Sequence, residues 1–238
     1  MFKSREIVLN LYTQRPDIFH YAQWQRAATE KPDWWKSLKS VKPTIDAPFR
    51  GNTMKYCSGF NDLYRKAFIV PLWSEVLLGI GKKDTSLWRY SFADKQSKID
   101  CHPQFQRGTW LPETEYQHFK FNVPWMAECT HDIDFLYTSA EYQSEDPFQF
   151  MTLNGLVNYK SMLGTDVNVM FKRGIEDQEI LLQKDTPLAM VVPLTDKKVK
   201  IKHHLLSQDE MDRKRFKGKP FLWFNNGYQK AKKCPFHK

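Results

Sequence analysis

Between residues 119 and 202 the chain repeats one pattern, in which short apolar segments rich in β-branched and aromatic residues are separated by turn residues. Val167, Val169 and Phe171 alternate with other side chains, as on a strand with one buried face. Seven segments are predicted strands: 119–126, 133–142, 148–157, 165–172, 179–183, 188–194 and 197–202. Many short strands without crossover helices favour a mainly β fold, either an antiparallel sandwich or a barrel.

A hairpin is predicted just before this series. Residues 68–80 and 86–93 are strand-like, and a turn beginning at Gly81 joins them. Pro71 interrupts the first segment, and its missing N–H predicts a bulge or an edge position. At the other end of the series, lysines alternate with Val199 and Ile201, which is typical of an edge strand protected by charge.

The flanking regions differ from this β-rich body, which we assign to residues 51–205. Residues 1–50 carry four prolines and a tryptophan-rich patch, so we expect an irregular arm packed on the body by its aromatic side chains. Residues 206–238 are predicted to form a basic helical tail. Ser207 and Glu210 have the spacing of a capping box at its start. One short helix, at residues 58–67, is expected within the body.

The composition supports a large core. Aromatic residues make up 15% of the chain, and each buried ring removes a large apolar area from water. We expect Trp73, Trp88, Phe171 and Leu188 to be core residues. The first eleven residues do not resemble a signal peptide, and no apolar run approaches the length of a membrane span. The sequence therefore predicts a cytoplasmic protein with reduced thiols and no membrane partner.

The net charge of +9 is concentrated at the C-terminal end. Residues 196–238 contain 13 Lys or Arg against 4 Asp or Glu, and the remaining chain is balanced. A localised basic segment favours an anionic partner, although a solvated helix has the same composition. The candidate anion contacts are Lys214, Arg215, Lys217 and Lys219. Contacts of this type would give weak, non-specific and salt-sensitive binding of nucleic acid.

The sequence contains no phosphate loop, nucleophile elbow or zinc-protease motif. Its strongest polar cluster surrounds His131 and Asp134. His131 with Asp132 or Asp134, plus one distant histidine, could form a site for iron or zinc with two histidines and one carboxylate as ligands. The distant histidine would be His102, His203 or His204. The usual spacing of one residue between the histidine and the carboxylate is absent, and a polar turn is the alternative. No cofactor is predicted beyond this metal hypothesis.

Residues 151–194 resemble part of the dUTPase and dCTP-deaminase superfamily. The segment that begins at Gly155 matches one family motif, and the strand that begins at Lys184 matches another. The resemblance implies a related β-clip topology and a nucleotide-binding alternative. Asn158 occupies the position of the catalytic aspartate, and an amide cannot serve as a carboxylate base. The match therefore argues against that family's enzymatic activity.

The whole chain also resembles a group of uncharacterised proteins found in marine T4-like phages. The shared features are the Trp34-Trp35 arm, the segments 54–57 and 68–73, His102 with Gln106, and the strand at 184–193. The resemblance implies a phage protein, located in the infected host cell or in the virion.

We therefore expect a non-enzymatic binding or structural protein, with a protein partner or a second copy of itself as ligand. A metal-dependent enzyme on a β-barrel scaffold is the alternative.

Overall fold

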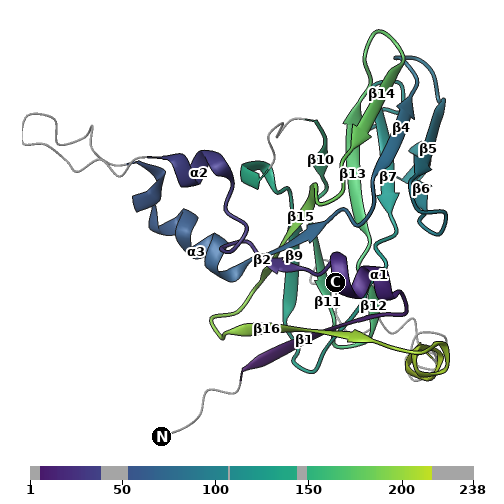
Figure 1. The fold of residues 1–238 in the computed structure, drawn as a ribbon. Coiled ribbons are helices and arrows are strands. Elements are labelled where there is room, and N and C mark those ends of the chain that lie inside the picture. Colours follow the sequence, from purple (N-terminus) through teal and green to yellow (C-terminus); the bar gives the residue numbers. More distant parts are fainter. Residues whose placement is uncertain (1–5, 39–52, 107, 144–148, 216–238) are drawn as a thin grey trace, which may run out of the picture.

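The structure is a computed structural model that describes residues 6–38, 53–106, 108–143 and 149–215. In Figure 1, a tall group of antiparallel strands stands at one side of the molecule and two helices project from the other. The projecting helices are α2 (Asp33–Ser37) and α3 (Ser58–Lys66), and α1 (Pro16–Tyr21) lies beneath the tall group in this view. The expected mainly β fold is confirmed, but the described strands do not close into a barrel.

The described residues form four sheets. The first has the order β12-β8-β1-β16, with strands Leu163–Gly164, Met126–Cys129, Ile7–Thr13 and Val199–Leu205. The second has the order β10-β13-β7-β6, with strands Met151–Thr152, Val167–Lys172, Tyr116–Phe121 and Ile99–Cys101. The third has the order β11-β9-β15-β3-β2, with strands Gly155–Asn158, Asp134–Thr138, Pro187–Pro193, Phe68–Pro71 and Gln25–Arg26. The fourth has the order β14-β4-β5, with strands Gln178–Leu182, Val76–Ile80 and Trp88–Phe92.

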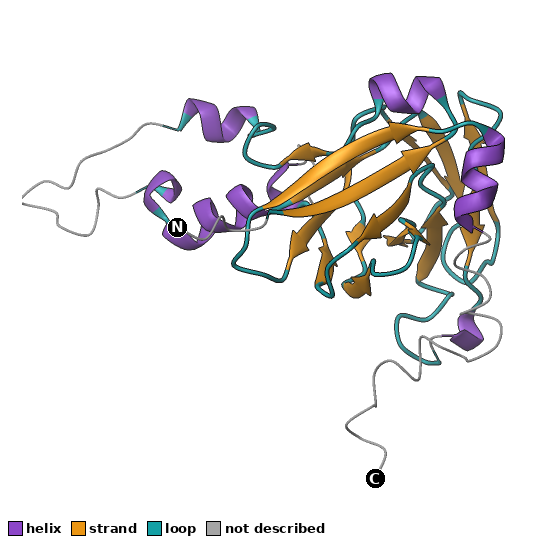
Figure 2. Cartoon of the chain, turned by 90° about the horizontal axis from the view of Figure 1, so that it is seen from below, coloured by secondary structure: helices purple, strands orange, loops and turns teal. Residues whose placement is uncertain are grey.

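Short 3-10 helices occur in the connections, namely η1 (Met54–Tyr56), η2 (Gln104–Gln106) and η3 (Glu141–Gln143). All of the strand pairs just described are antiparallel except one, because β1 and β16 run parallel. Figure 2 shows these two long strands side by side across the molecule.

The irregular arm expected over residues 1–50 differs from the structure at Ile7–Thr13. These residues form β1, which lies inside its sheet between β8 and β16. Ile7, Leu9 and Leu11 alternate along the strand and are fully buried. The physical reason is the same period of two that marks the other strands, so the N-terminal segment is part of the β body.

Two further expectations about the strands are confirmed. β16 lies at the edge of its sheet, where Lys200 and Lys202 are exposed. β4 and β5 pair antiparallel, with Val76 opposite Phe92 and Ile80 opposite Trp88. The segment 68–80 is nevertheless two strands, because β3 ends at Pro71 and joins a different sheet. The register of β3 against β15 shifts beside that proline, as expected for a bulge.

The main core is shared by all four sheets. Trp73, Phe171 and Leu188 are buried in it, as the sequence predicts. The same prediction is wrong for Trp88, which is only partly buried and packs edge-on against Phe119 at 5.5 Å between ring centroids. Trp88 lies on β5, an edge strand whose side chains are all partly or fully exposed, so this ring covers the core without being enclosed by it.

A second, smaller cluster packs beneath α2 and α3. Phe60 and Tyr64 recur at the spacing of one helical turn on α3 and are buried there, which confirms the predicted helix at residues 58–67. The ring of Trp35 stacks on Phe60, with centroids 4.4 Å apart. Ile69 and Met190 supply the sheet side of the cluster. This second cluster joins the helices to the β2 end of the third sheet.

A buried arginine, Arg173, connects the ends of β4, β5, β7 and β13. Arg173 is 1% exposed and donates to the carbonyl oxygens of Gly81, Glu113 and Leu87 at 2.7, 2.8 and 3.2 Å. Its third nitrogen donates to the side chain of Gln117 at 2.6 Å. Because backbone carbonyls from separate loops meet on one guanidinium, the hairpin and its neighbours are held in register.

The beginning of the predicted C-terminal helix is confirmed. Residues 208–215 are helical, and the Ser207 hydroxyl donates to the Glu210 carboxylate at 2.8 Å. The amide of Ser207 donates to the same carboxylate, which completes the capping box. The remainder of the predicted tail, from residue 216, lies outside the described residues. So does the predicted site of Lys217 and Lys219.

No helix in the described part of the chain is long and apolar enough to cross a membrane. The three described cysteines, Cys57, Cys101 and Cys129, are free thiols.

Candidate functional site

A cleft of about 680 Å³ opens between α1, α2 and the β2 end of the third sheet. We call it the aromatic cleft. Its lining residues are His20, Tyr21, Gln23, Gln25, Glu30, Lys31, Pro32, Asp33, Trp34, Lys36, Ile69, Pro71, Gln143, Asp185 and Pro187. They come from segments distant in the sequence, including η3 and the turn before β15, so the cleft exists only in the folded chain.

Two aromatic side chains remain exposed in this cleft. Tyr21 ends α1 and is 70% exposed, and Trp34 lies on α2 and is 38% exposed. Trp34 is held in place, because its Nε1 donates to the carbonyl oxygen of Tyr142 at 2.9 Å. Its neighbour Trp35 is instead buried in the second cluster. The tryptophan-rich patch therefore divides, with one ring supporting the fold and the other facing the cleft.

Some of the charges around the aromatic cleft have partners within the protein. Asp33 accepts from Lys36 at 2.8 Å, and this hydrogen bond lowers the pKa of the Asp33 carboxyl. Lys31 lies over the ring of Trp35 at 5.2 Å, and Lys184 lies over Tyr21 at 5.4 Å. Cations positioned over aromatic faces are attracted by the ring quadrupole. The cleft is therefore polar and aromatic, with both signs of charge on its walls.

A second pocket, of about 470 Å³, lies beyond β2, between the C-terminal end of α3 and the turn that joins β15 to β16. We call it the basic pocket. Its cationic lining residues are Arg26, Arg65, Lys66, Lys197 and Lys198. Asp196 is the one carboxylate among the residues that line it. Gln25 and Arg26 are consecutive on β2, and each belongs to a different hollow because side chains alternate along a strand.

The four residues of the metal hypothesis do not assemble. The His102 ring lies beside His118, with centroids 4.7 Å apart, whereas His203 packs on Trp125 at 5.1 Å. His131 contacts the hydroxyl of Thr130 at 3.1 Å. Among the described residues, no three His, Cys, Asp or Glu side chains gather closely enough to hold a metal ion. The hypothesis fails because these side chains lie on separate elements: His102 follows β6, His203 lies on β16, and His131 and Asp134 lie just before and at the start of β9.

Asn158 and Asp134 have a structural arrangement instead. The Asn158 amide, at the end of β11, donates to the carboxylates of Asp132 and Asp134 at 2.8 and 3.1 Å. Its carbonyl oxygen accepts from the amide of Lys160 at 3.0 Å. The residue that the nucleotide-enzyme resemblance placed at the catalytic position therefore fastens the loop before β9.

Burial determines the protonation of His203. It lowers the pKa of the imidazole to about 4, with a smaller contribution from the neighbouring His204. The Nε2 atom of His203 is buried, and it has no hydrogen-bond partner among the described residues. The ring is therefore neutral at physiological pH.

The predicted anion contacts on the C-terminal helix are partly engaged by the protein. Lys214 lies 4.1 Å from the centroid of the Tyr12 ring and 3.1 Å from the Glu128 carboxylate. Burial opposes its charge, but the hydrogen bonds with Tyr12 and Glu128 outweigh burial and raise the Lys214 pKa. Arg215 lies 3.9 Å from Asp212. Lys214, which the sequence predicts to contact an anion, therefore attaches the C-terminal helix to the sheet.

Sequence reasoning did not identify either hollow as a site. The aromatic cleft had one signal, the adjacent Trp34 and Trp35, which differ in exposure although they are neighbours. The basic pocket had the lysine pair 197–198, whose partners Arg26 and Arg65 are far away in the sequence. No family model matches the chain, and comparison with curated proteins and with solved structures found no significant similarity.

Proposed function

We propose that this chain is a non-enzymatic binding protein that holds an extended segment of a partner protein in the aromatic cleft. The observation that carries the proposal is the pair of exposed aromatic side chains, Tyr21 and Trp34, on a cleft with polar walls. Tyrosine and tryptophan dominate the binding energy of protein interfaces, because each contributes a large contact area at low entropic cost.

The remaining walls suit a peptide better than a compact apolar ligand. Gln23, Gln25 and Gln143 line the cleft, and an amide side chain can donate to or accept from a peptide backbone. Small-molecule sites are mostly apolar and enclose their ligand, whereas this cleft is lined by polar and apolar groups in similar measure and is partly open. Its Asp33–Lys36 pair adds little net charge. The chemistry favours a polar segment with aromatic or aliphatic anchors.

At Asp33 and Trp34, the contacts made within the protein favour binding over catalysis. The carboxylate of Asp33 is committed to Lys36, and Trp34 is fixed by the Tyr142 carbonyl. General acid–base chemistry needs a group with its proton free to move toward the ligand, and the Asp33 pKa is lowered, away from neutral pH. The resemblance of the sequence to a phage protein group favours a partner from the phage or its host.

A peptide-display selection on the immobilised full-length chain tests the proposal. Peptides enriched on the wild type should bind Tyr21→Ala at least about tenfold more weakly, the loss expected for removal of an interface anchor. Tyr21 is well exposed, so its removal should leave the fold intact. Phe105→Ala is the matched control, because Phe105 is 81% exposed on η2 and outside the cleft.

Two results would overturn the proposal. One is that no peptide is enriched over an unrelated control protein. The other is that the enriched peptides bind Tyr21→Ala and Trp34→Ala as tightly as they bind the wild type.

A further inference from the structure

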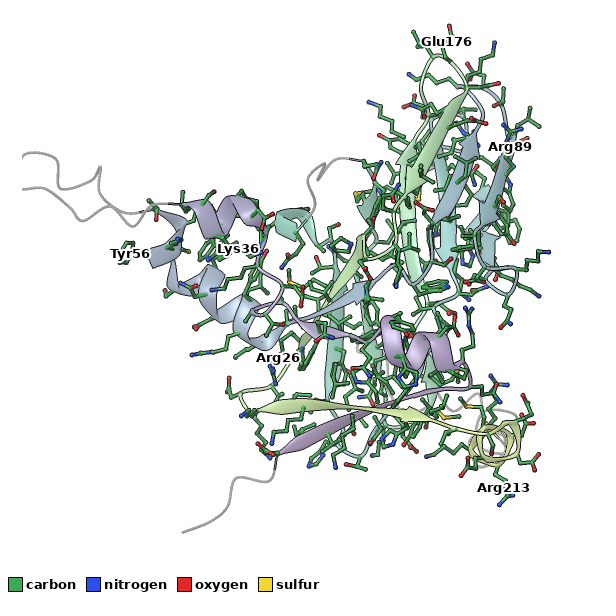
Figure 3. All side chains as sticks on the ribbon, in the orientation of Figure 1. Arg26, Lys36, Tyr56, Arg89, Glu176 and Arg213 are labelled. Atoms are coloured by element: carbon green, nitrogen blue, oxygen red, sulfur yellow. The ribbon has the colours of Figure 1, made fainter. Side chains whose placement is uncertain are left out.

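The basic pocket collects cations from three separate parts of the fold. Arg26 comes from β2, Arg65 and Lys66 from the last turn of α3, and Lys197 and Lys198 from the turn before β16. Figure 3 shows Arg26 beside α3, at one end of β16, whereas Arg213 lies at the other end. The described cations of residues 196–215 therefore lie at two places. Lys197 and Lys198 line the same pocket as Arg26, Arg65 and Lys66, which are far away in the sequence.

The carboxylates nearby neutralise only part of this charge. Lys66 lies 3.5 Å from Asp196, and Arg65 lies 2.9 Å from Asp62. No carboxylate of the described residues lies within ion-pair distance of Arg26, Lys197 or Lys198. The hydrogen bond from Lys200 lowers the pKa of Glu6, and the charge of Lys198 nevertheless contributes to the same shift. Cations that line one pocket repel one another, so an anion bound among them would relieve the repulsion.

Arg26 is oriented by neutral groups and forms no ion pair with a carboxylate of the described residues. Its guanidinium donates to the carbonyl oxygen of Arg65 at 3.0 Å and to that of Val199. It also lies over the ring of Phe68, 4.9 Å from the centroid. Bonds to neutral carbonyls orient the guanidinium but leave its positive charge uncompensated. A side chain fixed in this way loses little entropy when it meets a ligand.

The helix C-terminus explains some of these cations but not all of them. The negative end of the α3 dipole favours Arg65 and Lys66, which lie in its last turn. Lys197 and Lys198 lie in the turn before β16, where no helix dipole favours a positive charge. The apolar residues Ala28, Pro193 and Val199 also line the pocket, and they offer a contact surface for an apolar part of a ligand.

We infer that the basic pocket binds a small molecule that carries a di- or triphosphate group. A multiply charged phosphate chain matches several separated cations better than a single carboxylate does, and guanidinium groups bind phosphate oxygens well. The volume of about 470 Å³ leaves room for an apolar or ring-containing body beside the phosphates. This inference does not depend on the peptide in the aromatic cleft.

The test is calorimetric titration of the full-length chain with pyrophosphate and with ATP, at low and at high salt. The variant K197Q/K198Q removes two exposed charges from the pocket, and R213Q/R215Q removes two exposed charges from the C-terminal helix. The two variants have the same net charge, so they separate a local site from a general field. We expect K197Q/K198Q to weaken binding about tenfold or more, and R213Q/R215Q by less than about twofold.

Competition identifies the source of the phosphate. If ATP displaces pyrophosphate more effectively than short single-stranded DNA does, the ligand is a small molecule, as inferred. If the DNA competes better, the inferred ligand is wrong and the pocket holds a nucleic-acid backbone. Absence of pyrophosphate binding at low salt, or equal weakening by both variants, would overturn the site itself.

Discussion

The main core and the second cluster beneath α2 and α3 differ in how they are held together. The main core gathers buried side chains from all four sheets and is fastened by Arg173. The second cluster rests on a few large rings, chiefly Trp35, Phe60 and Tyr64, against one end of one sheet. Both candidate hollows border this smaller cluster, through Trp34 and Lys31 on one side and Arg65 on the other.

A site beside the second cluster therefore depends on fewer packing contacts than a site beside the main core would. Sites built beside a small cluster depend on few packing contacts, so one substitution can alter both the local fold and the ligand. Sites beside the large core would be protected by redundant packing. The comparison predicts that substitutions in the main core lower stability without changing ligand affinity, whereas those in the second cluster change both.

The largest expected effect is in the main core. Arg173→Met keeps an apolar stem but leaves the carbonyls of Gly81 and Glu113 and the side-chain oxygen of Gln117 without this buried donor. The Leu87 carbonyl still accepts from the Gly81 amide. Each buried acceptor left unsatisfied costs about 1–3 kcal/mol of unfolding free energy, so we expect a total loss of about 3 kcal/mol or more. Urea unfolding measures this cost. Pyrophosphate affinity, measured well below the melting temperature, should not change.

The control for this substitution is Arg89→Met in the neighbouring hairpin. Arg89 pairs with Glu179 on the surface, and its side chain is 74% exposed. Exposed pairs contribute less than about 1 kcal/mol. An equal loss of stability in both variants would contradict the role of Arg173 as the fastening of the main core.

The next effect is in the second cluster. Trp35→Ala removes a ring that is 4% exposed and stacked on Phe60. Substitution of a buried tryptophan by alanine costs about 3–5 kcal/mol, and we expect the low end because a small peripheral cluster can relax. Peptide binding in the aromatic cleft should weaken at the same time, since Lys31 and Trp34 both contact Trp35. Thermal unfolding and peptide titration of the same samples provide the two readouts.

Trp110→Ala is the matched control, because Trp110 is 55% exposed. It should alter stability by less than about 0.5 kcal/mol. If folded Trp35→Ala binds the peptide as tightly as the wild type does, the second cluster does not support peptide binding in the aromatic cleft.

The parts of the fold that follow a local period were predictable from the sequence. The hairpin of β4 and β5, the lysine-protected edge strand β16 and the Ser207–Glu210 box all depend on neighbours within a few residues. β1 has the same alternation, but the surrounding prolines and tryptophans obscured it. Its pairing with β16 joins residues about 190 positions apart, and no local pattern specifies such a contact.

The candidate sites were harder to predict for the same reason. The pocket cations Arg26 and Lys198 meet only because β2 and the turn before β16 converge in space. Charge counting assigns the positive excess to residues 196–238, but the count has no information about which charges face one another. The histidine cluster failed for the converse reason, because residue types suited to a metal were carried apart by the sheets.

The smallest expected effect is a pH dependence at the margin of the main core, where His203 packs on Trp125. Because burial and His204 lower the folded-state pKa of His203 to about 4, from an ordinary value of 6.5, the unfolded chain binds a proton that the folded chain excludes. Stability is therefore fully present above pH 6.5 and falls as the pH decreases toward 4. The loss should be on the order of 1–2 kcal/mol, since water reaches part of the ring.

His203→Phe should flatten this part of the profile. Phenylalanine keeps the contact with Trp125 and removes the buried Nε2 that lacks a partner among the described residues. Stability at pH 7 should change by less than about 1 kcal/mol, because an unsatisfied polar atom is replaced by an apolar one. His20→Gln, at an exposed position on α1, should keep the wild-type slope. Carboxylates such as Asp94 titrate in the same way in the wild type and in both variants. The difference between the urea midpoints of His203→Phe and His20→Gln at pH 5 therefore reports on His203. If the two midpoints are equal, burial against Trp125 does not keep His203 neutral in the folded state.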